Sequence, residues 1–352
     1  MFRLSSTLLL LAASASVLSA AEIDTVYRKS DGKAVGGEIT AVSKTEVVVT
    51  QKVGNKEEHI PANDIRSVEW KGEPIGLGLA RSNQRSGNLS EALEGYQQAL
   101  NESAGASKNL RGSIEYLIAE ASVQVAKADS SQIPVAIQKL KAYLESNLDH
   151  YRYYDAQMLL AEMALASKDT LTAETSFALL EQAPWADYQL AGRNGQGYSK
   201  LAQGDASGAK AIFDQVAAAN TTTPAETARK LDGMLGQADC LAQQSNFPEA
   251  IKILNQVVDQ ATAEDTRVLA RAYLKQGDCL AADGQQLKPA VVAYLHVDVI
   301  PSLAAHSDLH AEALYQLAKL WPAVGQPARA AEASAKLETE YPNSEWTKKL
   351  GS

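Results

Sequence analysis

The sequence predicts a mainly α-helical protein, in which a solenoid of about seven helical hairpins follows a small all-β domain. Three observations support this prediction. An alanine recurs seven times between residues 92 and 330, with larger apolar residues at fixed distances after it. Aromatic residues make up only 6% of the chain while alanine is frequent, which suits closely packed helices that contact only their neighbours. Residues 22–72 instead show the two-residue period of β-strands.

The first 21 residues predict a secretory signal peptide that is removed on export. Arg3 precedes a short apolar run, and Ser19, Ala20 and Ala21 provide the small residues that a signal peptidase requires. The apolar run is short for a membrane span, and an uncleaved anchor is the alternative. We therefore expect an exported protein, periplasmic or secreted, with no stable membrane insertion after cleavage.

Residues 22–72 predict a small domain of five short strands. We expect the strands near residues 24–28, 37–42, 46–52, 57–60 and 65–70. Asp31-Gly32 and Gly54-Asn55 provide tight turns. Gly36-Gly37 allows one strand to bend sharply enough to join both sides of a small barrel. The strand order and the glycine bend resemble those of the SH3-like or Sm-like small barrels.

The role of this predicted domain has two interpretations. A domain of this size buries too little surface to be very stable alone, so we expect it to dock on the first helices. Residues 71–74 are too few to form a flexible spacer before helical spacing begins at Leu77. The domain is then either a cap over the first hairpin or a module that binds a peptide or another ligand, such as cell wall or carbohydrate.

Seven alanines mark the second helices of the expected hairpins. They are Ala92, Ala136, Ala173, Ala209, Ala250, Ala290 and Ala330. Larger apolar residues follow most of them at four and seven positions, as Phe177 and Leu180 follow Ala173, and this spacing places all three on one helix face. A small residue lets two helices approach closely, while the larger side chains fill the layer between repeats.

The boundaries of the hairpins follow from these positions and from the turn residues. We expect hairpins at residues 75–101, 154–180, 188–216, 228–257, 268–297 and 313–342. The second hairpin is expected to have its first helix near residues 114–125 and its second helix after Pro134. Gly87 and Gly325 mark turns, and Pro184 and Pro224 are expected to end helices. Trp346 is expected to fold back over the last hairpin. Otherwise that hairpin exposes apolar surface, and the C-terminal end then forms a homo-oligomer or docks a partner.

The last hairpin resembles a known repeat. Its sequence, ALYQLAKLWPAVGQPARAAEASAKLETEYP, resembles the tetratricopeptide repeat, whose pattern starts W-x2-L-G-x2-Y and later carries A-x3-F and a proline. The resemblance implies a right-handed solenoid over residues 75–346 that binds a protein or peptide in its concave groove. Because the observed spacing of roughly 36 to 44 residues is looser than the 34 of this family, Sel1-like or other helical-pair solenoids stay possible. The Tyr-Pro-x-Ser ending at residues 341–344 resembles that of tetratricopeptide proteins of the bacterial cell envelope.

The resemblance also implies which residues bind a partner. In tetratricopeptide proteins the first helices of the repeats line the concave groove. The equivalent positions here are Met158, Glu162, Asn194, Tyr198, Leu235, Asp239, Leu274, Asp278, Tyr315 and Lys319. We expect Tyr198 and Tyr315 to be exposed aromatic side chains that anchor the partner, and a merely solvated inner face is the alternative.

No motif predicts an enzyme, a cofactor site or a metal site. The sequence contains no phosphate-binding loop, HExxH motif or nucleophile elbow. Gly192, Gly195 and Gly197 lack the preceding strand of a dinucleotide-binding loop, so we expect them to allow close helix approach. His306 and His310 are four residues apart without further ligands nearby, and are expected to be surface residues.

Charge and cysteine content narrow the classes of function further. A formal charge of −9 disfavours nucleic-acid binding, because an acidic protein repels phosphates. Cys240 and Cys279 occupy equivalent positions in adjacent repeats, about 10 Å apart, whereas a disulfide requires less than about 7 Å. We expect two buried free thiols, with a disulfide as the alternative in an oxidising compartment.

The sequence therefore predicts a non-catalytic exported scaffold that binds a protein or extended peptide in the solenoid groove. Two alternatives stay open at this point. One is a structural envelope component that self-associates, and the other is a cell-wall or carbohydrate binder that uses the β-domain.

Overall fold

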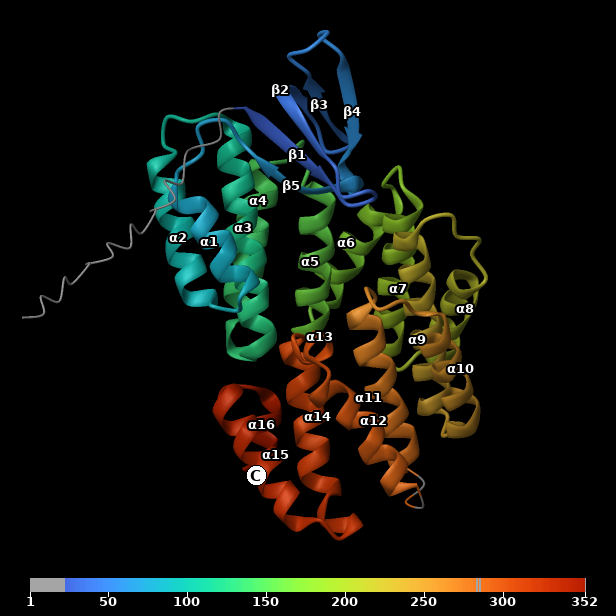
Figure 1. The fold of residues 1–352 in the computed structure, drawn as a ribbon. Helices are drawn as coiled ribbons and strands as arrows, with labels where there is room; N and C mark the ends of the chain where they lie inside the picture. Colours follow the sequence, from blue (N-terminus) through green and yellow to red (C-terminus); the bar gives the residue numbers. More distant parts are fainter. Residues whose placement is uncertain (1–22, 283, 285, 352) are drawn as a thin grey trace, which may run out of the picture.

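A computed structural model describes residues 23–282, 284 and 286–351 (Figure 1). These residues form five β-strands followed by sixteen α-helices. The predicted fold class, a helical solenoid preceded by a small β-domain, is confirmed. The predicted signal peptide lies outside the described residues. Within the described part of the chain, no helix combines the length and the apolar character needed to cross a membrane.

The five strands form one antiparallel sheet, close to the predicted positions. They are β1 (Asp24–Arg28), β2 (Ala34–Val42), β3 (Glu46–Thr50), β4 (Glu57–Pro61) and β5 (Ile65–Glu69). The order across the sheet is β4-β3-β2-β1-β5. The largest difference from the prediction is at β2, which begins three residues earlier than expected.

The expected bend at Gly36-Gly37 is confirmed. The first part of β2 pairs with β1 up to Gly37, and the second part pairs with β3 from Glu38 onward. A Cβ atom at Gly37 would lie 2.4 Å from the backbone oxygen of Thr50, so only glycine fits at this crossing point.

A closed barrel does not form. Among the described strands, β4 and β5 are the two edges and do not pair with each other. Instead, the Arg152 side chain in front of helix α5 donates hydrogen bonds to the backbone oxygens of Ile65 and Arg66 in β5. The helical part of the protein therefore covers the edge that β4 would occupy in a closed barrel. Assignment to the SH3-like class stays a prediction.

The seven helical hairpins are present, and several helices are longer than expected. Their helices are α1 (Gly76–Arg85), α2 (Leu89–Glu102), α3 (Lys108–Ala128), α4 (Ile133–Ser146), α5 (Tyr153–Ala166), α6 (Thr170–Glu181), α7 (Ala186–Ala202), α8 (Ala206–Ala217), α9 (Pro224–Gln243), α10 (Phe247–Gln260), α11 (Thr266–Ala282), α12 (Leu287–Val299), α14 (Ser307–Leu320) and α15 (Pro327–Glu340). Two short helices, α13 (Pro301–Ala304) and α16 (Glu345–Leu350), precede and follow the last hairpin.

The turn residues have the expected roles with one exception. Gly87 and Gly325 both adopt a φ of +80°, which favours glycine, and end the first helices of their hairpins. Pro224, which was expected to end a helix, instead begins α9. Proline is tolerated there because the first turn of a helix does not use its backbone N–H groups, and the Thr223 side chain caps the helix by accepting from the Glu226 N–H.

The recurring alanines lie at the contacts between helices, as predicted. The first six are fully buried, and each belongs to a hydrophobic cluster that joins neighbouring helices. Ala330 on α15 is only partly buried. The reason is that α15 is followed by the six-residue helix α16 and not by another full hairpin.

Glycines face the large side chains that follow these alanines. A Cβ atom at Gly195 would lie 2.1 Å from the Phe177 ring, and Cβ atoms at Gly197 and Gly236 would lie 2.6 and 2.3 Å from the Phe213 ring. These distances are too short for any residue other than glycine without movement of the ring. The interpretation of the glycines in α7 as positions of close helix approach is confirmed.

The β-domain docks on the solenoid through a buried polar network. The indole nitrogen of Trp70 donates to the Ser113 hydroxyl on α3 over 3.0 Å. The buried Arg152 pairs with the buried Asp155 over 2.8 Å. A single hydrophobic cluster extends from Val26 in β1 to Leu110 in α3. The sheet, which lies at one end of the helices in Figure 1, is therefore continuous with the core of the first hairpins.

His150 lies at the centre of this junction and is 3% exposed. Its Nδ1 atom is 2.7 Å from the Tyr143 hydroxyl, and its Nε2 atom is 3.2 Å from the backbone oxygen of Asn109. Burial disfavours the charged imidazolium and lowers the pKa of His150 to about 3. The folded protein therefore holds this histidine neutral.

We predict that Gly236→Ala destabilises the protein, because the new methyl group collides with the Phe213 ring. The matched control is Gly78→Ala in α1, where a Cβ atom meets nothing within 4 Å. Both changes add the same helix propensity, so their difference isolates the collision, for which we expect about 1–3 kcal/mol. Chemical denaturation measures both. Equal stabilities would contradict the close packing at Gly236.

We predict that acid destabilises the junction through His150. Between the unfolded pKa of 6.5 and the folded pKa of about 3, only the unfolded chain binds the proton, so the free energy of unfolding falls as pH falls. One such group contributes up to about 1.4 kcal/mol per pH unit. Between pH 6.5 and 5, the free energy of unfolding should therefore change less steeply with pH in His150→Gln than in the wild type, because glutamine cannot titrate. An unchanged slope would contradict the neutral, buried histidine.

Candidate functional site

The inner face of the solenoid lines a partly open cavity of about 650 Å³. Its walls come mainly from the first helices of hairpins two to seven, namely α3, α5, α7, α9, α11 and α14, together with the start of α16. Ser130, Ile133 of α4 and Phe177 of α6 add to the lining. Figure 1 shows the C-terminal helices, in red, returning to the side of the molecule where α3 lies, and α14 contacts α3. The curvature of the solenoid therefore turns the expected groove into a cavity with walls from both ends of the repeat array.

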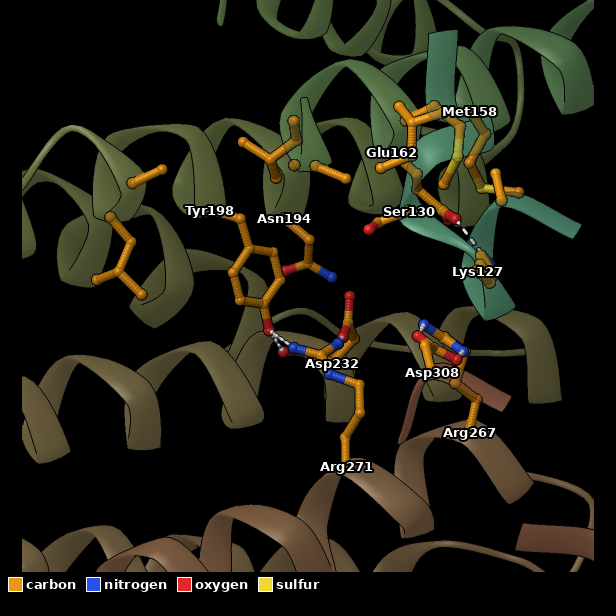
Figure 2. A pocket seen from close by; sticks show the side chains of 18 of the residues that line it. Lys127, Ser130, Met158, Glu162, Asn194, Tyr198, Asp232, Arg267, Arg271 and Asp308 are labelled. Atoms are coloured by element: carbon orange, nitrogen blue, oxygen red, sulfur yellow. Dashed lines mark hydrogen bonds and ion pairs between the residues drawn. The ribbon is translucent and has the colours of Figure 1, made fainter. Parts of the chain in front are cut away.

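Four of the ten residues expected in the groove line this cavity. Met158 and Glu162 project from α5, and Asn194 and Tyr198 project from α7 (Figure 2). Members of each pair are four residues apart, so they share one helix face. Their partner-binding role stays a prediction.

The other six expected residues do not line this cavity. Leu235 and Leu274 are buried in the cores between repeats. On the C-terminal half of the inner face, Asp239 lies 3.3 Å from the Lys275 amino group, and Asp278 accepts a hydrogen bond from the Tyr294 hydroxyl. These two aspartates therefore have partners inside the protein.

Tyr315 contacts the C-terminal helix α16, and Lys319 contacts Tyr315. The centres of the Tyr315 and Trp346 rings are 5.2 Å apart, and the Lys319 amino group lies 5.2 Å from the centre of the Tyr315 ring. Trp346 thus folds back over the last hairpin, as expected, and it also reaches the cavity wall. Tyr315 is partly buried by this contact and is not the exposed aromatic that we expected.

Tyr198 also differs from the expected exposed aromatic. Its hydroxyl donates to the backbone oxygen of Asp232 and lies 2.6 Å from a guanidinium nitrogen of Arg271. Its ring packs on Phe213, with 4.9 Å between centres. The side chain is therefore a fixed part of the cavity wall, and its polar end is already used.

The sequence analysis missed most of the charged residues of the cavity. Three ion pairs lie in its wall: Lys127 with Glu162, Arg267 with Asp308, and Arg271 with Asp232. Apart from Gln243, the lining residues of α9, α11 and α14 lie in the N-terminal halves of these helices, about two turns before the positions carried over from the repeat pattern. The helices are tilted across the cavity, so the lining position moves along them from repeat to repeat. The one sequence signal for this charged wall is the spacing of Arg267 and Arg271, which are four residues apart and so lie on one face of α11.

These ion pairs shift the ionisation of the cavity carboxylates. Burial raises the pKa of Glu162, but the charges of Lys127, Arg267 and Arg229 outweigh this effect and lower it overall. Burial likewise opposes ionisation of Asp308, and two hydrogen bonds from Arg267, of 3.1 and 2.6 Å, reverse the effect and lower its pKa. Both carboxylates are therefore charged at neutral pH and are matched by cations.

Arg229 on α9 is the exception among the cavity cations. One of its guanidinium nitrogens lies 3.3 Å from the Met158 sulfur, and its backbone oxygen accepts a hydrogen bond of 2.7 Å from the Asn194 amide. In the described part of the chain, no carboxylate lies within ion-pair distance of this guanidinium.

His306 and His310 were expected to be surface residues, and for His310 this prediction is wrong. This residue is 2% exposed and lies within 2.9 Å of both the Tyr341 hydroxyl and an Asp298 carboxylate oxygen, which join α14 to its neighbours. His306 bonds to the Thr266 hydroxyl over 3.0 Å. Across residues 23–282, 284 and 286–351, no group of three metal-ligating side chains converges.

The two cysteines are free and buried, as expected. Cys240 packs with Ala209 and Phe213, and Cys279 belongs to the next cluster along the solenoid. Burial raises the pKa of both thiols to about 11. They therefore act as small apolar residues between helices and not as reactive thiolates.

Comparison with known proteins identifies the repeat class. Residues 194–266 and residues 312–344 both match family models of the tetratricopeptide repeat. The first segment begins inside α7 and includes α8, α9 and α10, and the second begins inside α14 and includes α15. The solenoid therefore contains tetratricopeptide repeats, as the sequence pattern of its last hairpin implied.

Two solved structures share this fold. One is a tetratricopeptide repeat protein from Parabacteroides merdae ATCC 43184, with a TM-score of 0.50 and 17% identity over 78% of this chain and 95% of that one. The other is a Rap protein complexed with competence and sporulation factor, with a TM-score of 0.52 and 16% identity over 79% of this chain and 75% of that one. At these identities the likeness shows the fold alone. No curated protein matches the chain by sequence.

Proposed function

We propose that this protein is a non-catalytic, exported scaffold that binds a protein partner by holding an extended peptide segment in the solenoid cavity. The observation that carries this proposal is the cavity itself, whose wall is built mainly from six successive first helices and from the start of α16. A repeat array of this kind offers a long inner surface, and here its two ends meet around a space of about 650 Å³.

The size and lining of the cavity suit a short segment of chain. Binding sites for small ligands typically measure about 300–1,000 Å³ and combine apolar walls with a few polar groups. Met158, Met163 and Trp346 provide apolar surface, and the ion pairs provide fixed charges. A folded domain is too large for this space, whereas an extended segment or a loop of a partner fits.

Two further points support a binding role. The charged groups of the wall are mostly paired with one another, which favours recognition over acid–base chemistry. The structurally similar Rap protein was solved with competence and sporulation factor bound, so a fold of this class is able to hold another molecule. Export is proposed from the N-terminal sequence, in which an apolar run precedes Ser19-Ala20-Ala21.

The competing functions have less support. Self-association through the C-terminal end was motivated by an uncovered last hairpin, but α16 and Trp346 cover it. The β-domain shares a hydrophobic cluster with α1 to α3, which favours a cap over an independent ligand-binding module.

A photo-crosslinking amino acid at position 158 tests the proposal. We expect p-benzoylphenylalanine in place of Met158 to give a discrete adduct under ultraviolet light in the native cell. The same change at Val292, which is 53% exposed on α12 and does not line the cavity, should give none. Adducts only at Val292, or equal adducts at both sites, would contradict binding in the cavity.

The mature N-terminus tests the export part of the proposal. Mass spectrometry of the protein purified from its native cell should find Glu22 as the first residue, because cleavage is expected after Ala21. A chain that retains Met1, or that fractionates with the cytoplasm, would contradict export while leaving the binding proposal intact.

A further inference from the structure

Methionine is rare in this chain and is concentrated at the cavity. The sequence contains four methionines, and Met1 lies outside the described residues. Of the other three, Met158 and Met163 on α5 both line the cavity, whereas Met234 is buried in the core between repeats. Figure 2 shows the Met158 side chain directed into the cavity. A thioether is flexible and polarisable, so it adapts to the shape of an apolar ligand and makes favourable contacts with the edge of an aromatic ring.

The wall beside Met158 is apolar and includes an aromatic ring. Ala191 and Gly195 line the cavity from α7, and their spacing of four residues places them on one helix face. Gly195 lies directly over Phe177 of α6, since a Cβ atom there would lie 2.1 Å from the ring. Phe177 also lines the cavity, and Met158 packs against the hydrophobic cluster that contains it. Because Ala191 and Gly195 are small, they leave this apolar wall open to a side chain from outside.

Arg229 borders the same part of the wall. One of its guanidinium nitrogens lies 3.3 Å from the Met158 sulfur, which is an uncharged and weak acceptor. Within the described ranges of the chain, this guanidinium has neither a carboxylate at ion-pair distance nor an aromatic ring over its plane. The Met158 thioether is therefore its neighbour in the cavity wall, and the cation has no charged or aromatic partner in that part of the chain.

Other arginines of this protein lie over aromatic rings. Arg271, which lines the cavity too, lies 4.9 Å from the centre of the Tyr198 ring in addition to its ion pair. The buried Arg152 lies 5.1 Å from the centre of the Tyr151 ring. A guanidinium stacks on a ring because both are planar and because the face of the ring is electron-rich. A ring from a bound segment would give Arg229 the partner that Arg271 and Arg152 find within the chain.

The surroundings of Arg229 favour an aromatic ring over the two other groups that could lie there. A carboxylate placed against Met158 and Phe177 would lose hydration on its apolar side, which is costly for a charged group. An aliphatic side chain would fill the apolar space but would gain nothing from the guanidinium. An aromatic ring has little hydration to lose, and it interacts favourably with both the thioether and the cation.

We propose that Met158, Phe177, Gly195 and Arg229 form a subsite for an aromatic side chain of the segment that enters the cavity. The ring packs against the Met158 thioether and the apolar wall at Gly195 and Phe177, and it offers its face to the Arg229 guanidinium. This inference rests on the proposed function and adds a chemical requirement for the bound segment, namely Phe, Tyr or Trp at one fixed position.

The test uses the full mature protein and a synthetic library of random heptapeptides. Their N-termini are acetylated and their C-termini amidated, so that the chain ends carry no charge. Peptides that the protein retains are sequenced by mass spectrometry and resynthesised for measurement of Kd. We expect Phe, Tyr or Trp to be enriched at one position. Alanine at that position should raise Kd at least about tenfold, because buried aromatic anchors are among the strongest contacts of an interface.

Cyclohexylalanine isolates the aromatic part of the interaction. For a retained peptide with phenylalanine at the enriched position, this exchange keeps the apolar bulk and removes the π-electrons. Kd for the wild type should rise about three- to tenfold, the loss expected for one cation–π contact. Arg229→Gln should raise Kd of the phenylalanine peptide by a similar factor. The exchange should then have little further effect on Arg229→Gln, because the two changes remove one interaction.

The matched control is Lys230→Gln. Lys230 donates to the Ala219 backbone oxygen and does not line the cavity, so this change should leave the Kd of both peptides as it is in the wild type. Circular dichroism and Tm show whether each variant is folded.

The outcomes separate this inference from the proposed function. Retained peptides without an aromatic preference, or with Asp or Glu enriched in its place, would overturn the aromatic subsite. Equal Kd values of the phenylalanine and cyclohexylalanine peptides for the wild type would overturn the contact with Arg229. In each of these cases the proposed function stands if Met158→Arg, which places a long charged side chain in the cavity, abolishes binding. If the wild type retains no peptide, or if Met158→Arg leaves all binding unchanged, both the proposed function and this inference are wrong.

Discussion

The close approach of successive helices at small residues is the constraint on which the rest of the structure depends. Fully buried alanines of the second helices, and glycines such as Gly195 and Gly236 that face Phe177 and Phe213, leave no room for larger side chains. Interiors are packed at near-crystalline density, so these contacts fix the distance and angle between neighbouring helices within narrow limits. Because each hairpin touches mainly the next, small angles accumulate along the array. Here they accumulate until α14 contacts α3.

That curvature determines what kind of site the protein has. An array with less curvature would present a flatter concave surface, but this one forms a partly open cavity whose wall includes residues from α3 and from α14 and α16. The chain as a whole is acidic, yet four cations lie in this wall. Three of them are matched by carboxylates and the fourth, Arg229, is not. Charges inside such a space are costly unless they are paired, which accounts for the matching of most of these cations by carboxylates of the chain.

The β-domain contributes stability to the same architecture. On its own, the open five-stranded sheet would expose the edge at β5 and one apolar face. The buried Arg152 occupies the oxygens of that edge, and Trp70 and Val26 join the apolar face to the first hairpins. The domain and the solenoid therefore share one core at this end, while the six-residue helix α16 covers the other end through Trp346.

The sequence alone determined the local structure, since period, turn glycines and small-residue spacing are encoded within a few neighbouring positions. It predicted the strands, the seven hairpins, the alanines at helix contacts and the glycines of α7. It failed at Pro224, which begins a helix, and at Leu235 and Leu274, which pack between repeats. Only the tertiary structure decided which turns of each first helix reach the cavity. The orientation of each helix depends on the packing angles of all the helices before it. Residues as distant in sequence as Lys127 and Asp308 therefore line the same cavity only because these small angles add up along the array.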